Sequence, residues 1–387
     1  MMQNYRGASI NKNRDAWVEI NLSNLENNVL KVKEYILEHC PDKNNPPDIF
    51  AVIKADGYGH GSIMCAPTLI ACGVKEFGVA SIDEGIELRE NKIKNPVLVL
   101  GASPLWAFES AIKYDIAVSI FNEEHLSTAY QLYKRLGKKI KAHIKLDTGM
   151  NRIGLTYDNA DEFVKKVLSA DYIDLKGIFT HFADVENKEL FSSQITKFKN
   201  IVDCHLEEFK KRKIKVHCLN SPGIFEYPEY CYDMVRLGVT MWGITPYSKD
   251  NMNFKDMLPV MGLKGRITNI HTLKKGDGIS YGHTYIASKD TKVATIPIGY
   301  ADGLARKLSG NIKASLNGKT IQQIGRITMD QTMFDVSNVD CSIGDIVTLI
   351  GEENSEDNID SWAEKLDTIN YELVCRLKMR LKRIYVR

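Results

Sequence analysis

Short apolar runs alternate with longer segments of helical spacing through the first two thirds of the chain, and this alternation constrains the fold most. The runs are rich in Val, Ile and Phe, which is typical of strands buried on both faces of a parallel sheet. About eight of them occur in order: Ile49–Ala55, Phe77–Ile82, Pro96–Leu100, Ile116–Ile120, Ala142–Leu146, Leu175–His181, Val216–Asn220 and Met234–Val239. This α/β pattern predicts a (β/α)8 barrel of the TIM type.

The segments between the runs have the spacing of amphipathic helices. After Ser23, a predicted N-cap, apolar residues recur every three or four positions at Leu25, Val29, Val32 and Ile36. Two further segments of this kind are Glu84–Arg89 and Ala160–Leu168.

The pattern changes after about Pro259, where β-rich runs separated by turn signals replace the alternation. These runs are Leu263–Ile270, Lys292–Ile298, Lys319–Ile324 and Ile346–Ile350, followed by a helical stretch at Ile359–Leu366. An earlier run, Ala16–Ile20, predicts a further strand that could pair in another sheet than the barrel. Because 387 residues exceed the size of one hydrophobic core, we expect two domains. The barrel is predicted over residues 1–258 and a mostly β domain over residues 259–387.

Composition and charge argue against several partners. The net charge of +2 is too small to indicate nucleic-acid binding. The N-terminus lacks the apolar segment of a secretory signal, and no run reaches the roughly 18 apolar residues that span a membrane. The eight cysteines are scattered without a C-x-x-C pair, which favours reduced thiols over disulfides or a zinc site. We therefore expect a cytoplasmic protein that binds no metal, nucleic acid or membrane.

A lysine follows the first barrel strand, in the segment Ala51-Val-Ile-Lys54-Ala-Asp-Gly-Tyr58-Gly-His-Gly61. In βα barrels, catalytic residues lie at the C-terminal ends of the strands. Partial desolvation there lowers the pKa of a lysine and makes its amine a nucleophile for Schiff-base formation. The segment alone is equally compatible with a lysine that points to solvent.

Two late strands end in groups suited to an anion. His217-Cys-Leu-Asn220-Ser221-Pro and Met234-Val-Arg236-Leu-Gly238-Val239 lie where barrels of this type often bind phosphate. Ser221 offers a hydroxyl group, and Gly238 lets backbone N–H groups approach an anion. Arg236 stands in an apolar run, where an unpaired charge is costly, so it serves either a ligand or a structural salt bridge.

The second domain concentrates Tyr, Arg and Asp beside glycines. The segments are Ile279-Ser-Tyr281-Gly-His-Thr-Tyr285, Gly299-Tyr300-Ala-Asp-Gly-Leu-Ala-Arg306, Gly325-Arg326-Ile-Thr-Met329-Asp330-Gln331 and Thr368-Ile-Asn-Tyr371-Glu. Each alone is more typical of a turn, but together they predict one site built from several loops.

Taken in order, these segments resemble the motifs of the bacterial alanine racemase family. The similar stretches are A-V-I-K-A-D-G-Y-G-H-G, K-L-D-T-G-M-N-R-I-G, M-V-R-L-G, S-Y-G-H-T-Y, P-I-G-Y-A-D-G, G-R-I-T-M-D-Q and T-I-N-Y-E, and the similarity spans about residues 16 to 387. The combination is specific, although no single motif is. The resemblance implies a homodimer that interconverts L- and D-alanine with pyridoxal 5′-phosphate and supplies D-alanine for peptidoglycan.

The resemblance also implies roles for individual residues. Lys54, bound to the cofactor as an imine, and Tyr281 of the partner subunit would be the two bases on opposite faces of the cofactor. Cofactor binding is implied for Tyr58, His181, His217, Ser221, Arg236, Gly238, Val239 and Tyr371, with His181 also supporting Tyr281. Substrate binding is implied for Arg152 and the backbone of Met329, with a carboxylated Lys145 bracing Arg152. The access corridor is implied to include Tyr300, Arg306, Arg326 and Ile369.

Three positions depart from the family pattern and bear on substrate range: Trp242, Pro222 and Glu186. Tyr371 keeps the family pattern, and the resemblance therefore implies alanine rather than serine as the substrate. The alternatives are a racemase that prefers serine or has broad specificity, a barrel-type pyridoxal-phosphate decarboxylase, a non-catalytic carrier of the cofactor, and a phosphate-binding barrel without it. Tyr281 and Arg236 argue against the decarboxylase, because decarboxylation needs no base on the opposite face.

Overall fold

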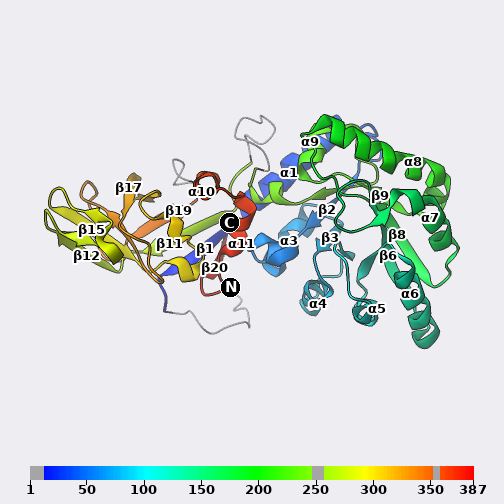
Figure 1. Cartoon of the computed structure of the whole chain (residues 1–387), viewed down its shortest axis with the longest axis horizontal. Coiled ribbons are helices and arrows are strands. Elements are labelled where there is room, and N and C mark those ends of the chain that lie inside the picture. The colour runs from blue at the N-terminus through cyan, green and yellow to red at the C-terminus, as the bar shows by residue number, and fades with distance from the viewer. Residues whose placement is uncertain (1–12, 246–256, 352–357) are drawn as a thin grey trace.

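Eight parallel strands build the part of the molecule drawn at the right of Figure 1. The computed structural model describes residues 13–245, 257–351 and 358–387. The barrel strands are β2 (Asp48–Val52), β3 (Glu76–Val79), β4 (Val97–Val99), β5 (Ala117–Ile120), β6 (Ile140–Asp147), β8 (Ile173–Phe179), β9 (Lys215–His217) and β10 (Met234–Leu237). They pair in the order β10-β2-β3-β4-β5-β6-β8-β9, and a short β7 (Leu155–Thr156) pairs with β6.

The two ends of this path approach each other and nearly close the barrel. Asp233 donates from its backbone N to Val216 O at 3.1 Å, and Arg236 N donates to Leu219 O at 3.0 Å. The predicted parallel barrel is therefore confirmed.

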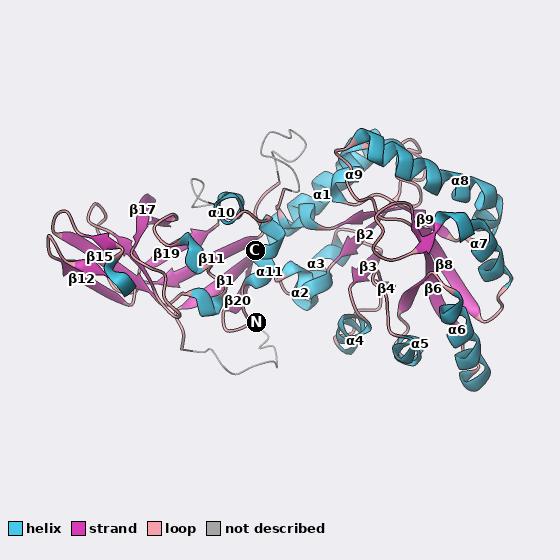
Figure 2. Cartoon of the chain, viewed as in Figure 1, coloured by secondary structure: helices cyan, strands magenta, loops and turns pink. Residues whose placement is uncertain are grey.

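Helices surround these strands (Figure 2). They are α1 (Leu22–His39), α2 (Lys54–Tyr58), α3 (Ser62–Ala71), α4 (Ile82–Glu90), α5 (Phe108–Lys113), α6 (Glu123–Leu136), α7 (Ala160–Ser169), α8 (Lys188–Arg212) and α9 (Ser221–Glu226). The predicted cap of α1 is wrong, because Asn21 rather than Ser23 accepts from the backbone N–H groups of Ser23 and Asn24. Across the described ranges, no helix is both long enough and apolar enough to cross a membrane.

A nine-stranded, mostly antiparallel sheet forms the other part of the molecule, in the order β12-β15-β18-β17-β16-β19-β11-β1-β20. Its strands are β1 (Ala16–Asn21), β11 (Met261–Arg266), β12 (Asn269–Leu273), β15 (Thr291–Ile296), β16 (Lys313–Leu316), β17 (Lys319–Ile324), β18 (Thr332–Asp335), β19 (Ile346–Ile350) and β20 (Lys382–Val386). A hairpin of β13 (Gly278–Ile279) and β14 (Tyr285–Ile286) and the helices α10 (Ile359–Leu366) and α11 (Asn370–Arg376) accompany the sheet. The mostly β second part is confirmed, but the predicted run Leu263–Ile270 is two strands, β11 and β12, rather than one.

The first strand of the chain joins this second sheet, as its early position suggested. β1 pairs antiparallel with β11, where Val18 lies opposite Leu263, and parallel with β20, where Val18 lies opposite Arg383. The described part of the chain therefore contributes β1 to the β sheet, then builds the barrel, and then returns to the sheet. The barrel boundary at residues 1–258 stays a prediction.

Six of the eight barrel strands end earlier than predicted, whereas β5 ends at Ile120 as predicted and β6 ends one residue later, at Asp147. β2 ends at Val52 instead of Ala55, and β8 ends at Phe179 instead of His181. Lys54 and His181 consequently follow the strands, at the edge where the C-terminal ends of parallel strands meet.

Candidate active site

Lys54 opens a left-handed turn directly after β2. Residues 55–58 all have φ between +52° and +63°, a conformation that costs a non-glycine residue about 1–2 kcal/mol. The carboxylate of Glu84 stabilises the turn by accepting from the backbone N of Ala55 and of Ala80, both at 2.7 Å. The strained turn follows Lys54 directly and is held by a residue of the next βα unit.

The C-terminal residues approach the same turn from the β sheet. α11 packs beside α2 (Figure 2), and Arg383 of β20 donates from Nε to Gly59 O at 3.2 Å. Arg383 also donates from Nη2 to Leu377 O at 2.7 Å, just after α11. These contacts connect the lysine turn to the helix that carries Tyr371.

The amine of Lys54 is shifted towards its neutral form. Burial lowers its pKa, the positive charge of Arg152 lowers it further, and Glu84 opposes the shift. Lys54 is half-buried, whereas Arg152 is exposed in the loop after β6. A neutral amine at the mouth of a barrel can attack a carbonyl carbon and form a Schiff base.

Lys145, on β6, is more strongly affected than Lys54. Its side chain is buried, and Nζ donates to Leu100 O at 3.2 Å. Burial, followed by the charges of Arg236 and Arg152, lowers the pKa of Lys145 to about 7. The amine of Lys145 is therefore shifted towards its neutral form, which is the form that reacts with an electrophile.

Arg236 is a buried guanidinium whose partners are mostly backbone carbonyls. Nη2 donates to Thr180 O and Cys218 O, both at 2.7 Å, and Nη1 donates to His217 O at 3.2 Å. The side chain is 3% exposed, and burial lowers its pKa to about 10. No carboxylate of the described residues forms an ion pair with Arg236, so the salt-bridge alternative is not supported.

Two buried imidazoles continue from Arg236 into the barrel. Nη1 of Arg236 lies 3.1 Å from Nδ1 of His217 and must donate, because a guanidinium has no acceptor. The neutral His217 then carries its proton on Nε2 and donates it to Nδ1 of His143 at 3.1 Å. Burial, with the charge of Arg236, lowers the pKa of His217 well below its usual value, and that of His143 falls to about 3.

His143 was missed by sequence analysis. It stands two residues before Lys145 in β6, and residues two apart on a strand face the same side. That spacing is the signal that could have identified it.

His181 contacts the same guanidinium from the end of β8. Arg236 Nη2 lies 3.3 Å from His181 Nδ1 and donates to it, which leaves the proton of the neutral ring on Nε2. Burial and the charge of Arg236 lower the pKa of His181 well below its usual value, so the ring stays neutral. Within the described part of one chain, His181 Nε2 has no hydrogen-bond partner.

Hydroxyl groups and backbone N–H groups converge after β10. Gly238 N donates to Ser221 Oγ at 2.8 Å. A Cβ on Gly238 would lie 3.5 Å from Tyr58 Oη and 3.6 Å from Ser221 Oγ, so the glycine leaves space between the two hydroxyl groups. Burial raises the pKa of Tyr58 and of Tyr371, which keeps both phenols protonated as donors. This arrangement, with Val239 at the start of η4 (Val239–Trp242), fits a phosphate group.

A second group of predicted residues lies in the β sheet. Tyr281 begins η6 (Tyr281–His283) and is 71% exposed. Its neighbour Ser280 donates from Oγ to Arg326 O at 2.7 Å, which brings the Tyr281 and Arg326 segments together. Met329 is 53% and Tyr300 40% exposed, in turns that touch each other.

The two groups are not joined within one chain. Among the described residues, no hydrogen bond or ion pair connects Tyr281 to Lys54. Ile369 is 61% exposed at the start of α11, and Arg306 is exposed in η8 (Arg306–Leu308).

A βα barrel with a half-buried lysine and a cradle of hydroxyl and backbone N–H groups at its strand ends is the arrangement expected of an enzyme that binds a phosphorylated carbonyl cofactor. Residues 20–246 match the family model of the alanine racemase N-terminal domain, and residues 260–385 match that of the C-terminal domain. The chain belongs to the alanine racemase family.

Individual relatives are similar over nearly the whole chain. The alanine racemase of Clostridium novyi is 36% identical over 383 residues, which cover 97% of this chain and 96% of the relative. The structure of alanine racemase from Clostridium difficile has a TM-score of 0.87 at 36% identity and covers 96% of both chains. The structure from Bacillus anthracis with bound L-Ala-P has a TM-score of 0.84 at 34% identity and covers 97% of this chain and 95% of that chain.

Proposed function

We propose that this chain is an isomerase that interconverts L- and D-alanine with pyridoxal 5′-phosphate. The observation that carries the proposal is the lysine turn of Lys54, whose last residue, Tyr58, faces the cradle of Ser221 and Gly238. One barrel edge thus offers an amine for the carbonyl group and donors for the phosphate of the same cofactor. Membership of the alanine racemase family supports the reaction.

The residues around the cradle would hold the cofactor in one orientation. Lys54 would bind it covalently, and the cofactor when bound supplies the electron-withdrawing ring that acidifies the Cα–H of an amino acid. The phosphate would be held by Tyr58, Ser221, Gly238, Val239 and Tyr371. Arg236 would donate to the ring nitrogen, and it cannot accept a proton because a guanidinium has only donors. His217 accepts a hydrogen bond from that guanidinium and in turn donates to His143.

We propose that Lys54 and Tyr281 move protons on opposite faces of the substrate, with Tyr281 provided by a partner subunit. A phenol with an ordinary pKa of about 10 is a weak base unless its anion is stabilised. The Nε2–H of His181, which has no partner among the described residues of one chain, would donate to the Tyr281 oxygen. The exposure of Tyr281, and of Ile286 at 53% and Ile369 at 61%, supports a homodimer with shared sites.

The substrate carboxylate would be bound by Arg152 and the backbone N–H of Met329. Lys145 is proposed to react with CO₂ through its neutral amine, forming a carbamate and releasing a proton. The negative carbamate would brace Arg152, whereas a protonated Lys145 would repel it. The access corridor is proposed to include Tyr300, Arg306, Arg326 and Ile369, whose arginines favour small anionic substrates.

A cytoplasmic location and the supply of D-alanine for peptidoglycan also belong to the proposal. All eight cysteines are free thiols, which supports a reducing compartment. The proposed domains are a cofactor-binding barrel over residues 1–258, from which β1 pairs into the second sheet, and a β domain over residues 259–387 that completes the partner's site.

Mixed dimers test this scheme. Lys54→Ala and Tyr281→Phe should each abolish racemisation, measured as D-alanine formed from L-alanine by chiral chromatography. When the two variants are co-refolded, half of the dimers are mixed and each has one intact site, so about a quarter of the wild-type activity should return. Tyr285→Phe, in the same hairpin, is the matched control and should stay active. Absence of recovery would contradict the shared site, and an inactive wild-type protein would contradict the proposed reaction.

A further inference from the structure

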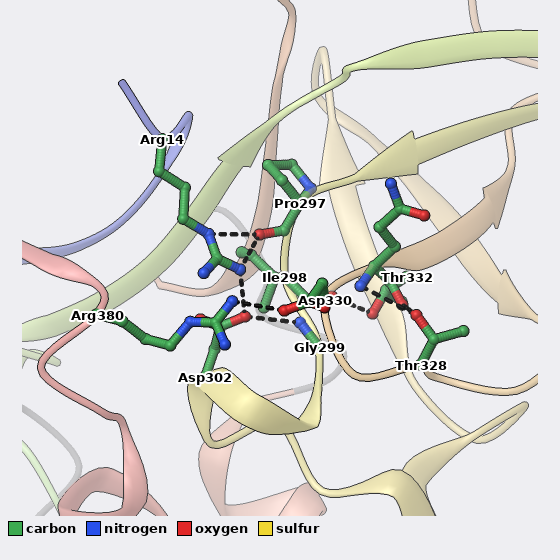
Figure 3. A network of polar contacts seen from close by, with 10 residues as sticks. Arg14, Pro297, Ile298, Gly299, Asp302, Thr328, Asp330, Thr332 and Arg380 are labelled. Atoms are coloured by element: carbon green, nitrogen blue, oxygen red, sulfur yellow. Dashed lines mark hydrogen bonds and ion pairs between the residues drawn. The ribbon is translucent and has the colours of Figure 1, made fainter. Parts of the chain in front are cut away.

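Asp302 is a fully buried carboxylate at the junction of four segments that are far apart in the sequence (Figure 3). Its Oδ2 accepts from Arg14 Nη2 at 2.6 Å and from Gly299 N at 2.9 Å. Its Oδ1 forms an ion pair with Arg380 Nε at 3.0 Å. Arg380 also donates from Nη2 to Asp330 Oδ1 at 2.6 Å, so one guanidinium bridges two carboxylates.

The segments that meet at Asp302 include two turns that carry proposed site residues. Tyr300 N donates to Thr328 O and Ala301 N donates to Met329 O, both at 3.0 Å. A Cβ on Gly299 would lie 2.3 Å from Thr328 O, so the two turns touch along their backbones. The position of the Met329 backbone therefore depends on the Tyr300 turn.

The other two segments hold the Tyr300 turn from outside. Arg14, which precedes β1, donates from Nε and Nη2 to Pro297 O at 3.1 and 2.7 Å. Lys378, which precedes β20, donates from its backbone N to Asp302 O at 2.9 Å. Without the Asp302 carboxylate, the guanidinium groups of Arg14 and Arg380 would lose their shared counter-charge, and removing one partner of a buried ion pair is strongly destabilising.

We infer that Asp302 is a positioning residue for substrate binding, which through Arg14 and Arg380 holds the Tyr300 turn against the Met329 turn. The Met329 N–H donates to no acceptor among the described residues, and the adjacent Asp330 is anchored by Arg380. The turn itself closes through Thr328 N to Gln331 O at 3.0 Å, and the ion pairs of Arg380 with Asp302 and Asp330 hold this turn, with its N–H, against the Tyr300 turn. The inference rests on the proposed function, in which this N–H binds the substrate carboxylate.

The test compares Asp302→Asn with the wild-type holoenzyme. The KM for L-alanine should rise roughly tenfold with a smaller loss of kcat, because binding of the carboxylate is impaired more than proton transfer. The visible absorption of the bound cofactor should be unchanged. Amide hydrogen exchange should be faster in residues 299–303 and 328–332 but not in residues 54–58. Asp290→Asn is the matched control, because Asp290 also pairs with a cation, Lys274, and accepts from the backbone N–H of Lys275, next to the ends of β12 and β15.

Arg380→Gln keeps the inference testable if Asp302→Asn fails to fold. Its side chain is 35% exposed, and the contacts of Asp302 with Arg14 and Gly299 remain. A smaller rise of KM and faster exchange in residues 328–332 are expected. Wild-type KM and exchange rates in both variants, or loss of cofactor absorption together with the change in KM, would overturn the inference. The exchange measurement needs no activity, so it distinguishes this inference from the proposed reaction, which fails if the wild-type protein does not racemise alanine.

Discussion

His60 should make the protein sensitive to acid through the turn that carries Lys54. Its ring is fully buried and stacks on Trp242 at 4.3 Å between ring centroids. Nδ1 donates to the carbonyl oxygens of Gly57 at 2.9 Å and Tyr58 at 3.1 Å, so the neutral ring carries its proton there. Nε2 is buried and has no hydrogen-bond partner in the described residues. Burial lowers the pKa of His60 to about 3.

A lowered histidine pKa means that the unfolded chain binds a proton that the folded protein does not. The stability contributed by the neutral ring is therefore complete above the unfolded pKa of about 6.5 and falls as the pH drops. The loss is about 1.4 kcal/mol per pH unit until the folded pKa is reached. Between about pH 7.5 and pH 5, His60 alone should lower the free energy of unfolding by about 2 kcal/mol.

The variant His60→Phe removes the titration and keeps an aromatic ring against Trp242. Urea unfolding of both proteins, followed by tryptophan fluorescence at about pH 7.5 and pH 5, gives the change in unfolding free energy for each. That change should be smaller in the variant by about 2 kcal/mol, whatever its absolute stability. His271→Gln, at an exposed position of β12, should behave like wild type. An unaltered pH dependence in His60→Phe would refute the reasoning, whereas a residual dependence is expected from His125 and His143, whose pKa values are lowered to about 4 and about 3.

Three further predictions concern residues at the C-terminal ends of the barrel strands. Arg236→Lys leaves three N–H donors for the five acceptors that now face the guanidinium, so two hydrogen bonds are lost. At about 1–3 kcal/mol for each lost bond, the free energy of unfolding measured by urea denaturation should fall by about 2–6 kcal/mol. An unchanged free energy of unfolding would contradict this prediction. Lys145 should gain the mass of one CO₂ in native mass spectrometry under CO₂ and lose it in acid, and Lys145→Met should not. Lys54→Arg should lose the visible absorption of the cofactor with an unchanged far-ultraviolet circular dichroism spectrum, and retained absorption would exclude Lys54 as the attachment site.

The order of the helices and strands was largely predictable, because it depends on interactions between residues that are close in the sequence. The alternation of apolar runs with helical spacing predicted the eight barrel strands, and the Asn317-Gly318 pair stands at the hairpin between β16 and β17, where Leu316 pairs with Lys319. Turn residues and apolar periodicity act over a few positions, so they can be read without knowing the rest of the chain.

The arrangement of the candidate site needed the tertiary structure. No local pattern showed that β2 ends at Val52 and that Lys54 opens a left-handed turn, because Glu84 of another βα unit stabilises that turn. Nor did any motif connect His143 to Arg236, since their contact through His217 exists only once the barrel has closed.

The ion pairs of Asp302 likewise combine a turn that was predictable from the sequence with contacts that were not. The glycines next to Asp302 in the sequence predicted a turn there. Arg14 lies 288 positions away in the sequence and reaches Asp302 only because β1 pairs with β11 and β20. Sequence by itself determined which segments become strands, helices and turns. Only the folded sheet decided which charges are buried together, because that depends on pairing between segments that no local interaction joins.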